Sequence, residues 1–226
     1  MPDLEREKAD AAARAVEFVQ AGMRVGLGTG STAAYAVKLL GAKVRAGLSI
    51  TGVPTSERTR VLAESERIPL TDFTQGVAID LTIDGADEAD EKLRLIKGGG
   101  GALLREKVVA SVTKRVVIIS DSTKVVDRLG RFPLPVEVVR FAWPVVAARL
   151  SDLGAKPKLR AAPGDTPFVT DEGHYILDAG FGAIDDPERL AATIDGVPGV
   201  VGHGLFIGLA HTLVVGRAGR VDVIER

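Results

Sequence analysis

Short apolar runs alternate with amphipathic segments through residues 1–130, and this alternation constrains the fold more than any other feature of the chain. Strands are predicted at 23–27, 49–53, 77–83 and 115–120. Helices are predicted at 5–20, 33–40, 56–66 and 102–114. A chain in which buried strands alternate with helices forms a parallel sheet covered by crossover helices. We therefore expect an α/β fold with a Rossmann-like, three-layer parallel-sheet domain.

The pattern changes after Phe132-Pro133-Leu134-Pro135. The predicted elements are strands or extended segments at 136–141, 158–160, 167–170, 174–178 and 200–206, with helices at 144–153 and 187–194. A β-α-β-β-α-β order of this kind is typical of a ferredoxin-like unit. Strand-like runs at 212–216 and 221–224 are expected to rejoin the first sheet. We therefore predict a Rossmann-like catalytic domain of 1–130 plus 207–226, with a ferredoxin-like α+β domain of 131–206 inserted.

Composition narrows the class of protein. The 226 residues are 46% hydrophobic with a net charge of −1, so there is no broad electrostatic case for nucleic acid or anionic membranes. Cysteine is missing, which excludes disulfides, thiol nucleophiles and thiolate metal sites. His174, His203 and His211 show no ligand spacing. The charged start has no apolar signal core, and no apolar run approaches the ~20 residues of a membrane span. A cytoplasmic protein is expected.

A glycine-rich turn, Gly26-Leu27-Gly28-Thr29-Gly30-Ser31-Thr32, joins the first predicted strand to the next helix. N–H groups at a helix start, with the hydroxyls of Ser31 and Thr32, are donors for an oxyanion. The alternative is a turn in which one of these hydroxyls merely caps the helix. The next strand ends in Val53-Pro54-Thr55, without a ribose-binding acid, and no Walker A lysine follows. A phosphate on a small molecule therefore fits better than a nucleotide.

Acidic residues follow the predicted strand 77–83, in the order Asp84-Gly85-Ala86-Asp87-Glu88-Ala89-Asp90. Ligands of open parallel sheets bind beyond the carboxyl ends of the strands, so these acids are well placed. Paired carboxylates in different environments can divide acid and base work. The spacing does not match a calcium-binding EF-hand loop. The alternative is a turn in which Asp84 and Asp87 only accept backbone hydrogen bonds.

Four consecutive glycines follow Lys97 and precede a predicted helix. Glycines lose much backbone freedom on folding, so such a run is best justified where an anion must approach the backbone at a helix start. Leu104, Val108 and Val112 form the predicted core stripe of that helix, and Glu106 lies instead near Ala102, Leu103, Val109 and Ala110. Partial desolvation there suits a general base. Lys97, the glycines and Glu106 are therefore predicted to surround one small ligand.

The stretch Asp121-Ser122-Thr123-Lys124 follows the predicted strand 115–120. Lys124 should thus emerge at the same sheet edge as the other motifs, where it can neutralise a phosphate or hold a substrate oxygen. The alternative is an ordinary surface lysine.

Together these motifs resemble ribose-5-phosphate isomerase, type A. The resemblance is carried by Thr29-Gly30-Ser31-Thr32, Asp84-Gly85-Ala86-Asp87-Glu88, Lys97-Gly98-Gly99-Gly100 with Arg105-Glu106-Lys107, and Gly130-Arg131-Phe132-Pro133-Leu134-Pro135-Val136-Glu137. Their order matches the family and the likeness runs nearly the whole chain. Gly101, Leu104 and Asp90 depart from it, at positions where alanine, threonine and asparagine are common.

The resemblance implies interconversion of D-ribose 5-phosphate and D-ribulose 5-phosphate through a cis-enediolate, without metal or organic cofactor. It implies Glu106 as the proton-shuttling base, Lys97 as an oxyanion-stabilising residue, and Asp84 and Asp87 as groups that handle hydroxyl protons, including ring opening. The implied substrate-binding residues are Thr29, Gly30, Ser31, Thr32, Asp84, Gly85, Ala86, Asp87, Lys97, Gly98, Gly99, Gly100, Lys124 and Lys8.

Related proteins of the same fold supply the competing functions. This chain lacks the catalytic histidine that a deaminase would need near the acidic loop. A coenzyme A transferase is usually larger than this chain. The alternative kept is a non-catalytic sugar-phosphate sensor, although no basic DNA-binding appendage is visible. The expected partner is a small sugar phosphate of the non-oxidative pentose phosphate pathway, with no nucleic acid or membrane. The resemblance suggests a homodimer or a tetramer.

Overall fold

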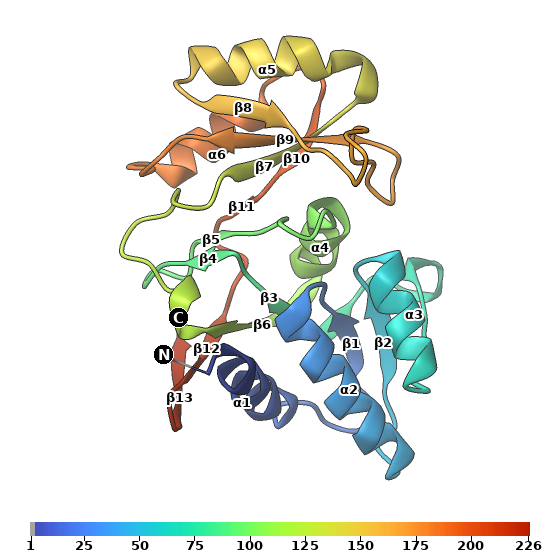
Figure 1. Cartoon of the computed structure of the whole chain (residues 1–226). Coiled ribbons are helices and arrows are strands. Elements are labelled where there is room, and N and C mark those ends of the chain that lie inside the picture. The colour runs from blue at the N-terminus through green and yellow to red at the C-terminus, as the bar shows by residue number, and fades with distance from the viewer. Residues whose placement is uncertain (1–2) are drawn as a thin grey trace. The chain divides into compact units, whose positions relative to one another are not determined.

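The computed structural model describes residues 3–226, which form two compact units (Figure 1). Unit 1 comprises the chain up to Ala86, together with Arg105–Val125 and Leu209–Arg226. Unit 2 comprises Asp87–Leu104 and Val126–Gly208. This division differs from the predicted boundaries, because residues 87–104 belong with unit 2 rather than with the Rossmann-like domain.

Unit 1 is built on a six-stranded sheet in the order β13-β12-β6-β3-β1-β2. The strands are β1 (Arg24–Leu27), β2 (Thr51–Pro54), β3 (Ile79–Gly85), β6 (Thr113–Asp121), β12 (Thr212–Arg217) and β13 (Arg220–Glu225). Neighbouring strands run parallel, except that β12 and β13 are antiparallel. The predicted parallel sheet is confirmed, and β12 returns to it beside β6.

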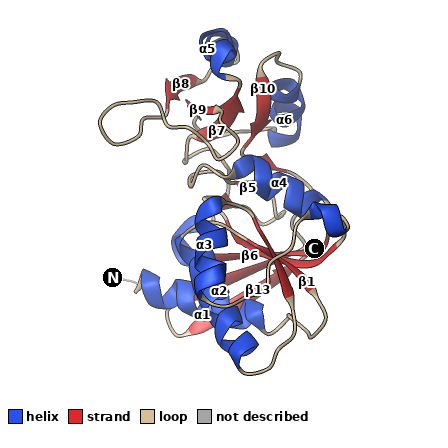
Figure 2. Ribbon diagram, turned by 90° about the vertical axis from the view of Figure 1, so that its right-hand side faces the viewer, coloured by secondary structure: helices blue, strands red, loops and turns tan. Residues whose placement is uncertain are grey.

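Helices cover both faces of this sheet. They are α1 (Leu4–Val16), α2 (Ser31–Arg45), α3 (Glu57–Ser65) and α4 (Leu103–Ser111). Figure 2 shows α1, α2 and α3 together on one side of the strands, where the main apolar cluster includes Val25, Leu27 and Leu81. On the other face, a Cβ at Gly26 would lie 2.1 Å from the Thr82 hydroxyl and 2.8 Å from Val109 of α4. A residue without a side chain at this position of β1 therefore lets α4 pack closely.

Several helix ends differ from the predicted ones, including that of α4, which ends at Ser111 rather than at 114, and the start of α2, at Ser31 rather than at 33. The helix predicted over 5–20 ends at Val16, and α2 continues to Arg45 rather than stopping near residue 40. Gly41 lies inside α2 and does not interrupt it. A Cβ at this position would lie 2.5 Å from the Cβ of Glu66, so the missing side chain allows this close contact. This glycine serves close packing rather than helix termination.

Unit 2 contains a four-stranded antiparallel sheet in the order β10-β7-β9-β8. Its elements are β7 (Leu134–Val138), α5 (Trp143–Asp152), β8 (Lys156–Leu159), β9 (Tyr175–Gly180), α6 (Pro187–Asp195) and β10 (Val200–His203). The chain order β-α-β-β-α-β with the last strand beside the first confirms the ferredoxin-like prediction. Its core includes Val136, Leu150, Leu177 and Ile194.

A second, three-stranded sheet of unit 2, in the order β11-β5-β4, is not predicted. Its strands are β4 (Glu88–Ala89), β5 (Leu95–Ile96) and β11 (Leu205–Phe206). Strands of two residues are too short to show an alternating pattern. Residues 3–226 also include three 3₁₀ turns: η1 (Phe73–Gln75), η2 (Ser122–Lys124) and η3 (Arg140–Ala142). No helix within residues 3–226 has the length and apolar character needed to cross a membrane.

The contact between α1 and β12 predicts the effect of Gly216→Ala. A Cβ at Gly216 would lie 1.9 Å from the backbone carbonyl oxygen of Glu7, so α1 must move away from the sheet. We expect a loss of about 1–3 kcal/mol in the free energy of unfolding, as for other overpacked sites, measured by urea denaturation. Gly180→Ala is the control, because its nearest neighbour atom lies 3.7 Å away. Equal effects of both substitutions would contradict the packing argument.

Candidate active site

The loops that carry the predicted motifs of unit 1 follow β1, β2, β3 and β6. These parallel strands end at the same edge of the sheet, the edge at which open α/β sheets bind ligands. The glycine-rich turn follows β1, Asp84 lies near the end of β3, and η2 with Lys124 follows β6. The sequence-based expectation that these segments emerge at one edge is confirmed.

Asp84 joins the glycine-rich turn to the end of β3. Its Oδ1 accepts hydrogen bonds from the N–H groups of Thr29 at 3.1 Å and Gly85 at 2.8 Å, and the residue is only 2% exposed. A Cβ at Gly28 would lie 2.2 Å from the same oxygen. The absence of a side chain at Gly28 therefore allows the carboxylate to reach the turn, and the two N–H groups offset the cost of burying its charge.

A cluster of buried hydroxyl groups holds the other side of this turn. The Thr29 hydroxyl lies 2.8 Å from those of Thr55 and Ser56, and the Thr59 hydroxyl donates to the carbonyl of Gly28 at 2.9 Å. The hydroxyl of Thr29 is thus bonded within the protein. This cluster was not predicted from the sequence, although Thr55 and Ser56 follow β2 and therefore emerge at the same sheet edge.

The first turn of α2 presents Ser31 and Thr32. Gly30, with φ of +119°, is the N-cap residue and has no side chain to cap the helix. The alternative in which Ser31 or Thr32 caps the helix is therefore wrong, because both lie inside its first turn. N–H groups at such a position have no partner within the helix and carry partial positive charge, which favours an anion.

Lys124 and Lys8 lie next to the contact that joins η2 to α1. The buried carboxylate of Glu7 accepts hydrogen bonds from the N–H of Ser122 at 2.9 Å and from its hydroxyl at 2.7 Å. No sequence pattern distinguishes Glu7 from the other charged residues of the first helix, so this buried group was missed. Lys8 Nζ lies 2.8 Å from Oε1 of Glu5, whose Oε2 accepts a hydrogen bond from Tyr35.

Glu106 lies on the buried face of α4 and is only 4% exposed. Leu103, Val109 and Ala110 are buried with it, as predicted, whereas Val108 is 45% exposed. The predicted core stripe is therefore wrong: Val108 is exposed, and Leu104 and Val112 are only half-buried. The buried face of α4 contains the carboxylate of Glu106. Apolar spacing alone does not reveal such a face, because a charged residue interrupts it.

In unit 2, Asp87, Lys97 and the glycine run are held by the three-stranded sheet. Oδ2 of Asp87 accepts a hydrogen bond from the N–H of Gly99 at 2.7 Å. Lys97 is 3% exposed, and its ammonium lies 5.4 Å from the centroid of the Phe206 ring. Gly98 and Gly101 have positive φ, and the N–H of Gly101 donates to the carbonyl of Gly98 at 3.0 Å. The run is thus a tight glycine turn before α4.

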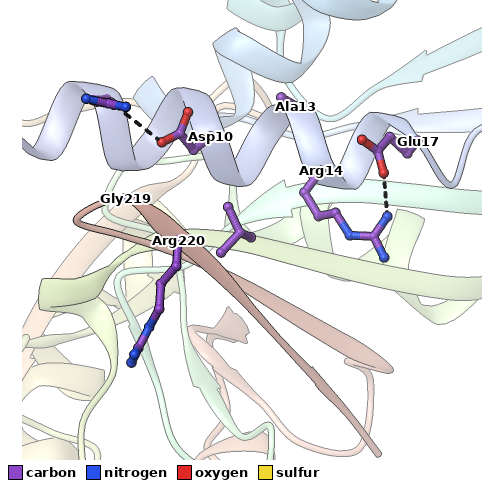
Figure 3. Close-up of a pocket in the computed structure, with 8 residues that line it drawn as sticks. Asp10, Ala13, Arg14, Glu17, Gly219 and Arg220 are labelled. Carbon is purple, nitrogen blue, oxygen red and sulfur yellow. Dashed lines mark hydrogen bonds and ion pairs between the residues drawn. The ribbon is translucent and has the colours of Figure 1, made fainter.

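Two cavities lie elsewhere and contain none of the predicted site residues. One, of about 330 Å³, lies between α1 and the turn after β12 and is lined by charged residues such as Asp10, Arg14 and Arg220 (Figure 3). The other, of about 550 Å³, lies in unit 2 beside Arg131 and Lys156.

The fold and these groups define a class before any comparison is made. A parallel sheet with a glycine-rich turn at its carboxyl edge, together with buried acidic and basic residues, is typical of an α/β protein that binds a small ligand at that edge. The sequence model of ribose 5-phosphate isomerase A (phosphoriboisomerase A) matches residues 51–220. This chain belongs to the ribose 5-phosphate isomerase A family.

Relatives and solved structures agree with this membership over nearly the full length. Ribose-5-phosphate isomerase A of Sphingopyxis alaskensis is 54% identical, with 100% of this chain and 99% of the relative covered. A solved D-ribose-5-phosphate isomerase in complex with phospho-erythronic acid is 41% identical, with a TM-score of 0.96, and covers 99% of this chain and 100% of its own. The ribose 5-phosphate isomerase A structure from Methanocaldococcus jannaschii is 38% identical, with a TM-score of 0.93, and covers 97% and 98%.

The contacts of Lys8 predict a titration shift at Glu5. The hydrogen bond from Lys8, followed by that from Tyr35, lowers the pKa of the Glu5 carboxyl. Lys8→Met should therefore raise the pKa of Glu5 toward its ordinary value, measured by NMR titration of the carboxyl carbon. A carboxyl with a lowered folded-state pKa stabilises the protein above its unfolded-state pKa, and this contribution is lost as pH falls through the folded-state pKa.

The stability difference between wild type and Lys8→Met should accordingly be present near neutral pH and shrink on acidification. Lys38→Met, which removes an exposed lysine from α2, is the control. An unchanged Glu5 titration in Lys8→Met would show that the ion pair does not form in solution.

Proposed function

We propose that this chain interconverts D-ribose 5-phosphate and D-ribulose 5-phosphate, with Glu106 as the base that moves the proton. The observation that carries the proposal is the family match over residues 51–220, joined to a carboxylate that α4 buries where the sequence analysis expected a base. The reaction is an internal redistribution of hydrogen and electrons, so it needs positioned acid–base groups and a means of stabilising an oxyanion.

The proton transfers balance without a co-reactant. A base removes the proton from C2 of the open-chain aldose, the C–H electron pair forms the C1–C2 double bond, and negative charge develops on O1. Return of the proton to C1, with transfer of the O2 proton to O1 and formation of the C2 carbonyl, gives the ketose. The two proton transfers share one cis-enediolate intermediate, so one base can serve both carbons.

Glu106 is proposed as that base. Its burial supports this role, because a carboxylate in a poorly solvated environment takes up a proton more readily than one in water. Lys97 and the N–H groups of Gly98 and Gly100 are proposed to stabilise the enediolate oxygen, and Gly99, whose N–H donates to Asp87, to contribute through the shape of the turn. The burial of Lys97 supports this assignment, since an ammonium screened from water interacts more strongly with a developing charge.

Asp84 and Asp87 are proposed to exchange hydroxyl protons with the substrate, including the proton transfer that opens the sugar ring. Backbone hydrogen bonds hold both carboxyl groups in place: Asp84 accepts them from Thr29 and Gly85, and Asp87 accepts one from Gly99. Gly85 and Ala86 are proposed to contact the sugar through their backbone. An ionised carboxylate can accept the proton of a ring hydroxyl.

The phosphate is proposed to bind the turn before α2, through Gly30, the N–H groups and hydroxyls of Ser31 and Thr32, and the charges of Lys124 and Lys8. Thr29 is proposed to contribute through the shape of the turn, since both its hydroxyl and its N–H have partners within the protein. We further propose that the chain acts in the cytoplasm, in the non-oxidative pentose phosphate pathway, as a homodimer or tetramer.

Glu106→Gln tests the assignment of the base. The amide keeps the size and hydrogen bonding of the side chain but cannot accept the C2 proton. We expect kcat to fall by at least ~10²–10⁴-fold, the usual contribution of a general base, while KM changes little. Exchange of the substrate C2 proton with solvent deuterium, followed by NMR, should be lost as well.

Glu64→Gln, on the exposed surface of α3, provides the matched control. Near-wild-type turnover by Glu106→Gln would sink the assignment and make Asp84 or Asp87 the next candidate base. A wild-type protein that binds ribose 5-phosphate but exchanges no C2 proton would instead be a sensor.

Substitution of Ser31 and Thr32 by alanine tests the phosphate site. Loss of both hydroxyls should raise KM for ribose 5-phosphate several-fold and weaken binding of inorganic phosphate, because only the backbone N–H groups remain as donors. Binding is measured by calorimetry and KM by steady-state kinetics. Ser65→Ala on α3 is the control. Unchanged binding of both ligands would place the phosphate elsewhere.

A further inference from the structure

We propose that Arg160 is a positioning residue that holds the glycine run 98–101 in the conformation needed to receive an oxyanion. Nη1 of Arg160 donates to the carbonyl of Gly98 at 2.9 Å and to that of Gly99 at 3.2 Å. All of these groups belong to unit 2. The inference rests on the proposed role of the glycine N–H groups, and it names the side chain that orients them.

The guanidinium is itself fixed by an ion pair with Asp178. Nε of Arg160 lies 3.0 Å from Oδ2 of Asp178, and Nη2 lies 2.5 Å from Oδ1. Such a two-point contact fixes the plane of the guanidinium as well as its distance. The side chain of Arg160 is 13% exposed, so solvent screens the pair only in part. With two nitrogens bonded to Asp178, the third is left pointing at the glycine run.

The segment after β8 supports this arrangement through Phe168. The N–H of Phe168 donates to the carbonyl of Arg160 at 2.8 Å, and the guanidinium lies 5.8 Å from the centroid of the Phe168 ring. A Cβ at Gly101 would lie 2.5 Å from the same ring. The segment that carries Arg160 and Phe168 therefore packs against both ends of the glycine run.

Peptide geometry shows how a contact with carbonyl groups orients N–H groups. In a trans peptide the C=O and N–H point in opposite directions. Because the Gly98 carbonyl faces Arg160, the N–H of Gly99 points the other way, where it donates to Asp87 at 2.7 Å. By the same geometry, holding the Gly99 carbonyl directs the N–H of Gly100 away from the guanidinium.

Glycine needs such an external constraint because it has little conformational preference of its own. A run of four samples many arrangements, and donors that reorganise during the reaction stabilise an oxyanion less than preorganised ones. Lysine cannot replace arginine here, because one ammonium does not present the planar fork that bonds a carboxylate at two points and a carbonyl at a third.

Arg160→Met and Arg160→Lys test the proposal. We expect kcat to fall by about 10²-fold, as for a small misplacement of catalytic groups, with KM for ribose 5-phosphate nearly unchanged. Binding of phospho-erythronic acid, which carries a carboxylate, should weaken, whereas binding of inorganic phosphate should not. In ¹⁵N spectra the amide resonances of Gly99 and Gly100 should shift or broaden.

Arg140→Met is the matched control. The Arg140 guanidinium also donates to a loop carbonyl, that of Gly173 at 2.6 Å, and lies over an aromatic ring, that of Tyr175. If Arg160→Met does not fold, Asp178→Asn loosens the same ion pair and takes its place. Wild-type kcat in the folded variant would overturn the proposal, as would equal weakening of inorganic phosphate and phospho-erythronic acid.

The two hypotheses fail in different ways. If Glu106→Gln abolishes turnover while Arg160→Met retains it, the positioning role is wrong and the base stands. If Arg160→Met loses turnover while Glu106→Gln retains it, the base is wrong and the positioning role stands.

Discussion

The buried carboxylate of Asp84 is the interaction on which the candidate site of unit 1 depends. It lies at the end of β3, and its Oδ1 accepts N–H groups both from its own loop and from the turn after β1. This contact requires that residue 28 have no side chain, because a Cβ there would lie 2.2 Å from Oδ1 of Asp84. This charge, together with the hydroxyl cluster on the other side, positions the glycine-rich turn relative to the sheet.

Other buried carboxylates organise loops in the same manner. Glu7 accepts a hydrogen bond from the N–H of Ser122 at 2.9 Å. Glu88 accepts hydrogen bonds from the N–H groups of Gly130 and Phe132 at 2.7 Å each. Asp90 accepts the N–H and guanidinium of Arg94. The alternative for the acidic loop named Asp84 and Asp87 as acceptors of backbone N–H groups, and both residues do accept such bonds. The protein thus fixes its irregular segments with charged acceptors, which bond N–H groups more strongly than neutral ones do.

Glycine and charge have complementary roles at the residues proposed for chemistry. Glycines at 28 and 98–101 let backbone and carboxylate groups approach closely, but they leave the backbone without a preferred conformation. Asp84, Asp87 and Arg160 restore that order, each by bonding backbone groups of a glycine-containing turn. In the proposed function, turns ordered in this way present donors that are already oriented, which is the condition for strong electrostatic stabilisation of an oxyanion.

Local sequence determined the parallel sheet and the ferredoxin-like order of unit 2, because these follow from periodicity within one element and from the order of the elements. Periodicity did not predict the buried face of α4, and it placed Ser31 and Thr32 in the turn before a helix that in fact begins at Ser31. Tertiary structure alone decided the partners of Glu7, Thr29 and Arg160, which lie 115, 26 and 62 residues away in the chain, at Ser122, Thr55 and Gly98. It also decided that residues 87–104 join unit 2 and that Val108 faces outward. Hydrogen bonds between distant segments leave no periodic trace in either segment, so only the folded chain reveals them.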